Sequence, residues 1–328
     1  MAEAKALWFR TRGHAEILEE RLPRLRPGWC RLHTLFSAIS PGTERLVYSG
    51  EVPEDLHREM RCPYMGGKFP FPVKYGYSLV GKITEGPEDS IGSVVHVLHP
   101  HQDQCIVRTE HTFPIPPQVP PSRATLASNL ETAVNAIWDS EVTIGEHALI
   151  IGFGAVGSLV ARLLSFMSGI KLEIVDANPS KIALAEKMGF KACDPGSVSG
   201  NFDLAFHASR SSDGLQLAVD RVGFEGRIIE LSWYGTNKIS LSLGGTFHSQ
   251  RKAILSSQVA TPSRRQRSRW DHARRRSLVF ELLERSEFDS HITHSVPFGG
   301  LPDIYNKLKA HPTEGLSYLV KYHEKTGE

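Results

Sequence analysis

The chain is poor in cysteine, and its four cysteines are scattered with no C-x-x-C pair: Cys30, Cys62, Cys105 and Cys193. This scatter argues against a structural zinc site built from cysteines and fits free thiols in a reducing compartment. No apolar run approaches the length of a membrane span, and the first residues lack the basic-then-apolar pattern of a secretion signal. We therefore expect a cytoplasmic protein that does not associate with membranes.

A strong excess of one charge is also missing. Lys and Arg together number 38 and Asp and Glu 36, which leaves a net charge of +2 in a chain of 328 residues. This balance gives no general reason to expect a nucleic-acid partner. One local exception is the arginine-rich segment 264–276. Such a run is usually a solvated face, and the alternative is a rim that attracts an anionic substrate.

The chain divides into segments with two kinds of apolar pattern. Residues 1–122 are short apolar runs broken by Pro and Gly, which predicts a β-rich domain, and the proline-rich stretch 114–121 reads as its linker. A helix is expected at 122–140, with Ser122 as its N-cap. Strand and helix patterns alternate over 123–288, which predicts a parallel sheet covered by helices. Residues 289–328 return to short strands and are expected to fold back onto the first domain.

The most informative stretch lies where residues 148–151 form a short apolar run that ends at Gly152. Gly152, Gly154 and Gly157 keep the G-x-G-x-x-G spacing, and residues 155–167 are predicted to form the following helix. The first glycine permits a tight turn, the second a close approach to a diphosphate, and the third close packing of helix on strand. The backbone amides of this turn are expected to face the cofactor phosphates, from Phe153, Ala155 and Val156 as well as the glycines.

A carboxylate follows at the end of the next predicted strand, which spans 171–175. Asp176 stands close to the roughly 20-residue spacing at which an acidic residue holds the adenosine ribose. A carboxylate accepts hydrogen bonds from both ribose hydroxyls but repels a 2′-phosphate, and no Arg follows directly. The sequence therefore favours NAD over NADP.

Further cofactor contacts are expected where later strands end, because ligands of doubly wound sheets bind at the carboxyl ends of the strands. One group follows the strand at 204–208, and the other follows the strand at 227–232. The candidates are His207, Ala208, Ser232, Trp233 and Tyr234. Ordinary packing under a loop is the alternative for the two aromatic residues.

Three segments together resemble the medium-chain dehydrogenase/reductase family. Residues 38–50 (AISPGTERLVYSG) resemble its Gly-Ile-Cys-x-Ser/Thr-Asp segment, and residues 75–83 (YGYSLVGKI) resemble its Gly-His-Glu-x-x-Gly-x-Val segment. The fingerprint with Asp176 and Lys181 resembles its cofactor site. The resemblance implies an α/β protein with a GroES-like β-rich catalytic domain and a doubly wound Rossmann domain, and a ribose contact from Lys181. Residues 40–45 and 131–136 look most like the bacteriochlorophyllide hydroxyethyl dehydrogenases.

The chain departs from this family at the positions of the catalytic zinc ligands. Ser40 stands where the family has Cys, Tyr77 where it has His, and Ser78 where Glu follows that His. Of the expected ligand positions only Glu131 carries a carboxylate. Catalytic zinc is held by three protein ligands drawn from His, Cys and carboxylates, so we predict a zinc-independent member with no metal site.

Without zinc, another group must stabilise the developing alkoxide and deliver a proton. His99 and His101 are candidate general acids, because the ordinary pKa of histidine lies near neutrality. Tyr77 is a candidate hydrogen-bond donor to the same oxygen, with Ser40 or Thr43 completing a relay. The alternatives are surface or structural histidines, and a tyrosine that fills the space left by zinc. The spacing of the nearby histidines and Cys105 matches no zinc pattern.

We therefore expect an NAD(H)-dependent, zinc-independent oxidoreductase that interconverts a secondary alcohol and a carbonyl of a small-molecule substrate. A quinone or enone reductase and a catalytically silent NAD-binding sensor are the alternatives. Apolar strands expected at 239–243 and 254–257 are suited to a homodimer interface.

Overall fold

The computed structural model describes residues 3–310 and 315–322. These residues form two compact units. The first unit draws on ranges 1–128, 280–313 and 317–328, and the second on 129–279 and 314–316. The sequence predicted domain boundaries at residues 122 and 288. Within the predicted last segment, 289–328, residues 311–314 and 323–328 lie outside the described part of the structure. Among the described residues, no helix combines the length and apolar character needed to cross a bilayer.

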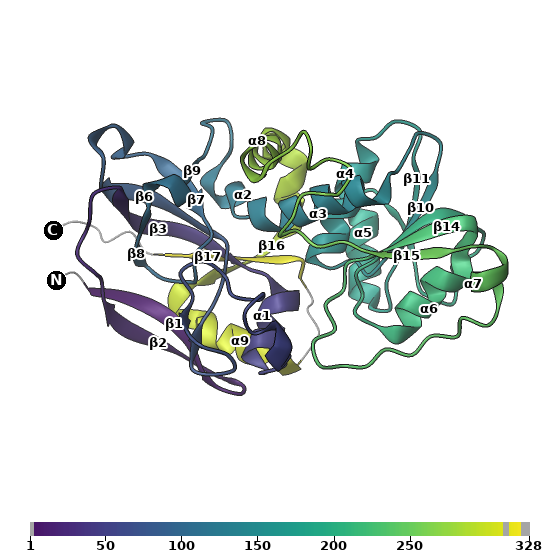
Figure 1. The fold of residues 1–328 in the computed structure, drawn as a ribbon, viewed down its shortest axis with the longest axis horizontal. Helices are drawn as coiled ribbons and strands as arrows, with labels where there is room; N and C mark the ends of the chain where they lie inside the picture. The colour runs from purple at the N-terminus through teal and green to yellow at the C-terminus, as the bar shows by residue number, and fades with distance from the viewer. Residues whose placement is uncertain (1–2, 311–314, 323–328) are drawn as a thin grey trace. The chain divides into compact units, whose positions relative to one another are not determined.

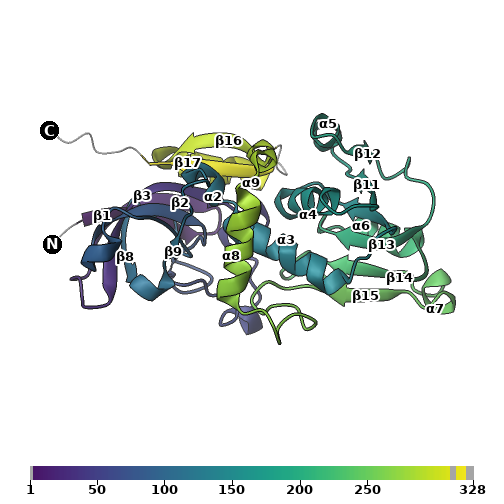
Figure 2. The same cartoon turned by 90° about the horizontal axis from the view of Figure 1, so that it is seen from above.

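The first unit is built on two sheets (Figures 1 and 2). The larger sheet has the strand order β16 (Ile292–Pro297), β17 (Ser317–Lys321), β3 (Trp29–Ile39), β6 (Leu79–Glu85), β7 (Val94–Val97) and β9 (Phe113–Pro114), and β8 (Gln104–Arg108) pairs with β3. The smaller sheet has the order β2 (His14–Arg21), β1 (Glu3–Thr11), β5 (Val73–Lys74) and β4 (Gly66–Gly67).

Strand β3 is the centre of the larger sheet, and β6, β8 and β17 all pair with it in antiparallel fashion. Buried apolar side chains from β3, β6, β7 and β8 form a core. β17 joins the sheet through the register Tyr318 to Ile39, so a strand near the end of the chain lies beside one near its beginning (Figure 2). The helices assigned to this unit are α1 (Pro41–Tyr48), α2 (Pro121–Ala124) and α9 (Leu301–Ala310).

The second unit contains a parallel sheet of six strands. Their order is β12 (Lys191–Cys193), β11 (Lys171–Val175), β10 (His147–Ile151), β13 (Phe202–His207), β14 (Val222–Glu230) and β15 (Ala253–Ser256). The chain order reverses between β10 and β13, which defines a doubly wound sheet, a fold whose ligands bind outside the carboxyl ends of the strands. The helices lying wholly or mainly in this unit are α3 (Ala127–Ser140), α4 (Ala155–Ser165), α5 (Pro179–Lys187), α6 (Ser212–Arg221), α7 (Thr246–Ser249) and α8 (His272–Leu283).

The expected α/β fold with a doubly wound parallel sheet is confirmed, and two local expectations are wrong. The single helix expected at 122–140 is divided into α2 and α3, and Pro120, rather than Ser122, is the N-cap of α2. Pro121 follows at the first helical position, where a missing N–H costs nothing. Residues 239–243 form no strand, whereas β15 accounts for most of the strand expected at 254–257.

Candidate functional site

The glycine-rich turn after β10 has the geometry that a dinucleotide diphosphate requires. Gly152 has a φ of 98°, and a side chain there would place Cβ 2.6 Å from the backbone N of Ser209. A Cβ at Gly157 would lie 2.0 Å from the carbonyl oxygen of Gly152, so helix and strand pack too closely for any other residue. A Cβ at Gly154 would meet nothing within 4 Å. The open face therefore lies at Gly154, the N-cap of α4, where a diphosphate fits the helix N-terminus.

Asp176 lies at the end of β11 and is bonded to the same turn. Its Oδ2 accepts the backbone N–H of Phe153 at 2.7 Å, and its Oδ1 accepts that of Asn178 at 2.8 Å. The carboxylate is half-buried. These bonds hold the negative charge beside the fingerprint, in the place expected for a ribose-binding acid. The ring of Phe153 is fully buried, so only its backbone faces the turn.

Lys181 is placed differently from the expectation of a ribose contact. The side chain is buried, and its Nζ donates to the carbonyl oxygen of Gly315 within the same unit. Burial lowers the pKa of Lys181 to about 8, and the charge of Asp176 opposes this shift. The amine is therefore engaged by the protein in this structure.

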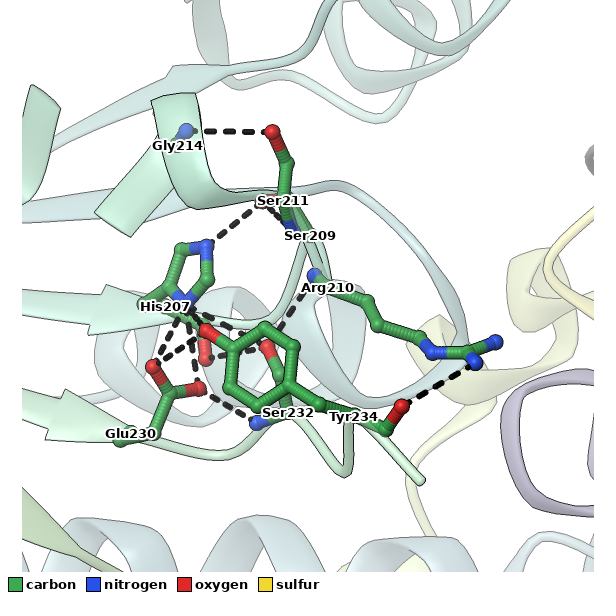
Figure 3. Close-up of polar contacts among 8 residues, drawn as sticks. All are labelled: His207, Ser209, Arg210, Ser211, Gly214, Glu230, Ser232 and Tyr234. Atoms are coloured by element: carbon green, nitrogen blue, oxygen red, sulfur yellow. Dashed lines mark hydrogen bonds and ion pairs between the residues drawn. The ribbon is translucent and has the colours of Figure 1, made fainter. Parts of the chain in front are cut away.

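The residues expected at the later strand ends form one polar cluster (Figure 3). His207 ends β13 and is fully buried, and Glu230 ends β14 beside it. His207 Nδ1 lies 2.8 Å from Glu230 Oε2, and its Nε2 lies 2.6 Å from Ser209 Oγ. The Tyr234 hydroxyl donates to Glu230 Oε2 at 2.9 Å, and the Ser232 N–H donates to Oε1 at 2.6 Å.

This cluster changes the roles expected for its members. A direct cofactor contact from His207 is not supported, because the ring is fully buried, and the Tyr234 hydroxyl is bonded to Glu230. Burial raises the pKa of Glu230, but the hydrogen bonds and charge of His207 and the hydrogen bonds of Ser232 together lower it by more. The pKa of Glu230 therefore lies below its ordinary value. The loop positions Ala208, Ser232 and Trp233 remain half-buried. Sequence reasoning missed Glu230, whose partner His207 is known only once the strands are in register.

In the first unit, Ser40 and Thr43 lie at the start of α1, and Tyr77 lies just before β6. Burial and the charge of Glu44 raise the pKa of the Tyr77 phenol well above its usual value, whereas hydrogen bonds with the Ser40 and Thr43 side chains lower it in part. The phenol therefore keeps its proton at neutral pH. The structure thus brings Ser40 and Thr43 together around the hydroxyl group of Tyr77, a half-buried residue.

The donors at these positions do not suit zinc. Ser40 offers a hydroxyl and Tyr77 a phenol that holds its proton, and both are poor zinc ligands beside Cys and His. Within residues 3–310 and 315–322, no group of three or more His, Cys, Asp or Glu side chains is arranged to hold a metal ion.

The two histidines expected as general acids are both buried. Nδ1 of His99 lies 2.9 Å from the carbonyl oxygen of Pro100, and burial lowers the pKa of His99 to about 3. His99 is thus neutral at physiological pH and has no proton to give from an imidazolium. His101 Nδ1 lies 2.7 Å from Ser37 Oγ, and its Nε2 lies 2.9 Å from Glu44 Oε2. Both histidines are therefore internal groups in this structure.

Glu131 is also committed to internal partners. Its carboxylate pairs with Arg275, with Nε and Oε1 3.3 Å apart, and with Arg276. All three side chains are buried, and the two guanidinium groups balance the charge of the carboxylate. Part of the arginine-rich segment is thus internal, and Arg274 lies over the Trp270 ring. Arg264, Arg267 and Arg269 remain exposed.

No protein-family model matches the chain. Among curated proteins, the chain is 28% identical over 157 residues to a probable diacetyl reductase of Saccharomyces cerevisiae and 26% identical over 140 residues to the (R,R)-butanediol dehydrogenase of the same yeast. These matches cover 43% and 41% of this chain but only 37% and 36% of the relatives' own length. A longer match, 21% identical over 327 residues, covers 89% of this chain and 92% of the D-guloside 3-dehydrogenase of Escherichia coli.

Solved structures match over nearly the whole chain. The 2R,3R-butanediol dehydrogenase of Bacillus subtilis superposes with a TM-score of 0.78 at 17% identity, covering 97% of this chain and 99% of that one. A short chain alcohol dehydrogenase of Escherichia coli CFT073, complexed with NADH, gives 0.77 at 16% identity, with coverage of 98% and 100%. A protein of Sinorhizobium meliloti 1021 described as a putative zinc-binding dehydrogenase, bound to NADP, gives the same values. These matches establish the fold, and the relatives are dehydrogenases.

Proposed function

We propose that this chain is a zinc-independent, NAD(H)-dependent oxidoreductase that interconverts a secondary alcohol and a carbonyl by hydride transfer. The observation that carries the proposal is the dinucleotide turn beside Asp176, in a chain whose Ser40 and Tyr77 replace two zinc ligands of the resembled family. We place the chain in the zinc-lacking branch of the medium-chain dehydrogenases/reductases, nearest in motif to the bacteriochlorophyllide hydroxyethyl dehydrogenases.

NAD(H), when bound, supplies or accepts the hydride. We assign proton handling to Tyr77, because its phenol stays protonated and lies in a hydrogen-bonded group with Ser40 and Thr43. In carbonyl reduction, the Tyr77 hydroxyl donates a hydrogen bond to the substrate oxygen and gives up its proton as the alkoxide forms. His99 and His101 are not assigned this role, since both are buried.

The test is turnover with a panel of secondary alcohols and NAD⁺ after dialysis against a chelator, with the zinc content measured on the same sample. We expect turnover without stoichiometric zinc. Tyr77→Phe removes the proton donor and is expected to lower kcat about a hundredfold with unchanged NADH affinity. Tyr64→Phe is the matched control, because the Tyr64 hydroxyl bonds His111 at 2.7 Å in an exposed position. Zinc that is stoichiometric and required for turnover contradicts the proposal.

Two other functions are outcomes of the same experiment. Reduction of quinones or enones with NADPH, and no oxidation of alcohols, indicates a quinone or enone reductase. NADH binding without turnover across the whole panel indicates a silent sensor, a reading favoured by the internal engagement of His101 and Glu131.

We further propose a cytoplasmic homodimer that acts on a small anionic molecule and binds neither nucleic acid nor membranes. The exposed arginines of the 264–276 segment support an anionic substrate. Leu243 and Leu255, the latter on edge strand β15, are exposed and support a subunit interface.

A further inference from the structure

Two loop segments, residues 208–211 and 231–234, directly follow β13 and β14 at the carboxyl edge of the parallel sheet. Register places His207 and Glu230 directly opposite one another as the last residues of these strands. Opposite residues of neighbouring strands project from the same face, so the imidazole and the carboxylate meet. Their separation of 2.8 Å follows from this register.

The imidazole and carboxylate reach both strand-end loops (Figure 3). His207 Nε2 bonds the Ser209 hydroxyl at 2.6 Å in the first loop. Glu230 accepts the Ser232 N–H at 2.6 Å and the Tyr234 hydroxyl at 2.9 Å in the second. Ser232 Oγ then accepts the backbone N–H of Arg210 at 3.1 Å, which ties the second loop to the first.

One residue in this network holds a backbone conformation that few side chains adopt. Arg210 has a φ of 59°, in the left-handed region, and its N–H is the group that Ser232 accepts. Such a conformation is unfavourable for a residue with a side chain and persists where its surroundings fix it. The hydrogen bond between His207 and Ser209 and the bond from the Arg210 N–H to Ser232 Oγ hold the chain at this position.

The glycine-rich turn after β10 is held at the same edge of the sheet by a separate set of contacts. The Ala208 N–H donates to the carbonyl oxygen of Ile151 at 2.8 Å, and Gly152 packs against the backbone of Ser209. Neither contact uses the His207 ring or the Glu230 carboxylate. The diphosphate half is therefore held through the backbone of the first loop, whereas His207 and Glu230 hold the side chain of Ser209 and the second loop.

We propose that His207 and Glu230 are positioning residues that fix the two strand-end loops for the nicotinamide half of the cofactor, and that they leave the adenosine diphosphate half unaffected. This inference rests on the proposed function, since it presupposes that NAD(H) binds. Glu230 fixes the amide of Ser232 and the side chain of Tyr234, and His207 fixes Ser209. None of the three bonds requires contact between the buried pair and the cofactor.

The experiment compares dissociation constants for NADH and for ADP-ribose, which lacks the nicotinamide. Glu230→Gln replaces by an amide the carboxylate that holds His207, the Ser232 N–H and the Tyr234 hydroxyl. We expect NADH to bind about tenfold more weakly, which corresponds to about 1.4 kcal/mol. ADP-ribose affinity is expected to change less than about twofold, because the Ala208 and Gly152 contacts persist.

Glu146→Gln is the matched control. Glu146 is also a partly buried carboxylate of the second unit, paired with Arg227 of β14 at 2.7 Å, with 17% of its side chain exposed against 12% for Glu230. Arg227 lies three residues before Glu230 in β14, and Glu146 directly precedes β10, at the edge of the sheet opposite the strand-end loops. We expect this variant to lose some stability and to leave the ratio of NADH to ADP-ribose affinity unchanged.

Tyr234→Phe keeps the test decisive if Glu230→Gln fails to fold, because it removes only the hydroxyl that donates to the Glu230 carboxylate. We expect about a threefold loss for NADH and no change for ADP-ribose. Equal losses for both ligands indicate a general structural role and overturn the inference, as does an unchanged affinity for NADH. A wild-type protein that binds ADP-ribose and NADH equally well also overturns it, whereas a wild-type protein that binds neither overturns the proposed function as well.

Discussion

Each unit contains a polar network made of the same four residue types. In the first unit, Ser37 bonds His101, His101 bonds Glu44, and Tyr305 donates to the same carboxylate oxygen. In the second unit, Ser209, His207, Glu230 and Tyr234 are connected in the same order. The histidine ring has opposite orientations in the two networks, since Glu44 faces Nε2 of His101 and Glu230 faces Nδ1 of His207.

The two networks differ in how much of the chain they join. The partners in the first unit are 64, 57 and 261 positions apart, and they come from β3, the turn before β8, α1 and α9. The partners in the second unit are 2, 23 and 4 positions apart and lie at two neighbouring strand ends. The same chemistry therefore joins distant elements in one unit and shapes adjacent loops in the other.

The carboxylates of the two networks also differ in their exposure to solvent. The Glu44 side chain is 0% exposed and that of Glu230 12% exposed. A carboxylate without access to water depends wholly on its protein partners. We therefore expect the first network to act mainly on folding stability and the second mainly on ligand binding.

Glu44→Gln is the change expected to have the largest effect. Glu44 accepts bonds from the Ser40 N–H at 2.7 Å, from His101 and from Tyr305, and an amide cannot accept all three. We expect the free energy of unfolding to fall by about 3 kcal/mol, as for other broken buried pairs. Urea denaturation measures it. Glu230→Gln is expected to cost about 1 kcal/mol, and a larger loss for Glu230→Gln than for Glu44→Gln would reverse the comparison.

His99 sharpens the comparison because its polar partner is a carbonyl group and not a carboxylate. Its pKa is lowered to about 3 by burial, so below about pH 6.5 the unfolded chain binds a proton that the native chain does not. Stability contributed by neutral His99 is therefore complete above about pH 6.5 and is lost as the pH falls toward 3.

The variant His99→Gln removes this titration. We expect the wild type to lose up to about 1.4 kcal/mol more per pH unit than the variant between about pH 6 and pH 4. Urea denaturation at several pH values gives the two slopes. Equal slopes would show that His99 titrates normally in the folded protein.

Removing one hydroxyl from each network is expected to have a smaller effect than Glu44→Gln. Tyr305 is fully buried, and its hydroxyl lies within reach of both Glu44 and His101. Tyr305→Phe is expected to lower the free energy of unfolding by about 1.5 kcal/mol, and Tyr234→Phe, at a half-buried site, by about 0.5 kcal/mol. Thermal unfolding of both variants measures the difference, and a Tyr234→Phe loss as large as that of Tyr305→Phe would contradict the assignment of roles.

The sequence was sufficient where structure depends on neighbours in the chain. The structure brings the fingerprint turn and Asp176 together as predicted, because a βαβ unit sets their spacing locally. β11 was predicted with its observed bounds for the same reason. The division of α2 from α3 was missed because it falls within a stretch whose apolar pattern fits one continuous helix.

The sequence was insufficient where a role depends on burial or on distant partners. His99 follows a strand in the position expected of a general acid, and only its burial in the folded chain shows that it is neutral. Glu44 and Glu230 went unnoticed because their histidine partners are fixed by tertiary packing and by strand register. Glu131 looked available until α8 placed Arg275 and Arg276 beside it.

The central claim, that this chain binds NAD(H) through Asp176, is tested most directly by titrating the wild type and Asp176→Ser with NADH and NADPH while following tryptophan fluorescence. We expect the wild type to bind NADH and to discriminate against NADPH, because the carboxylate repels a 2′-phosphate. Asp176→Ser is expected to bind NADH about tenfold more weakly and to lose the discrimination. Unchanged affinity of Asp176→Ser for both cofactors, or a wild type that prefers NADPH, would contradict the account.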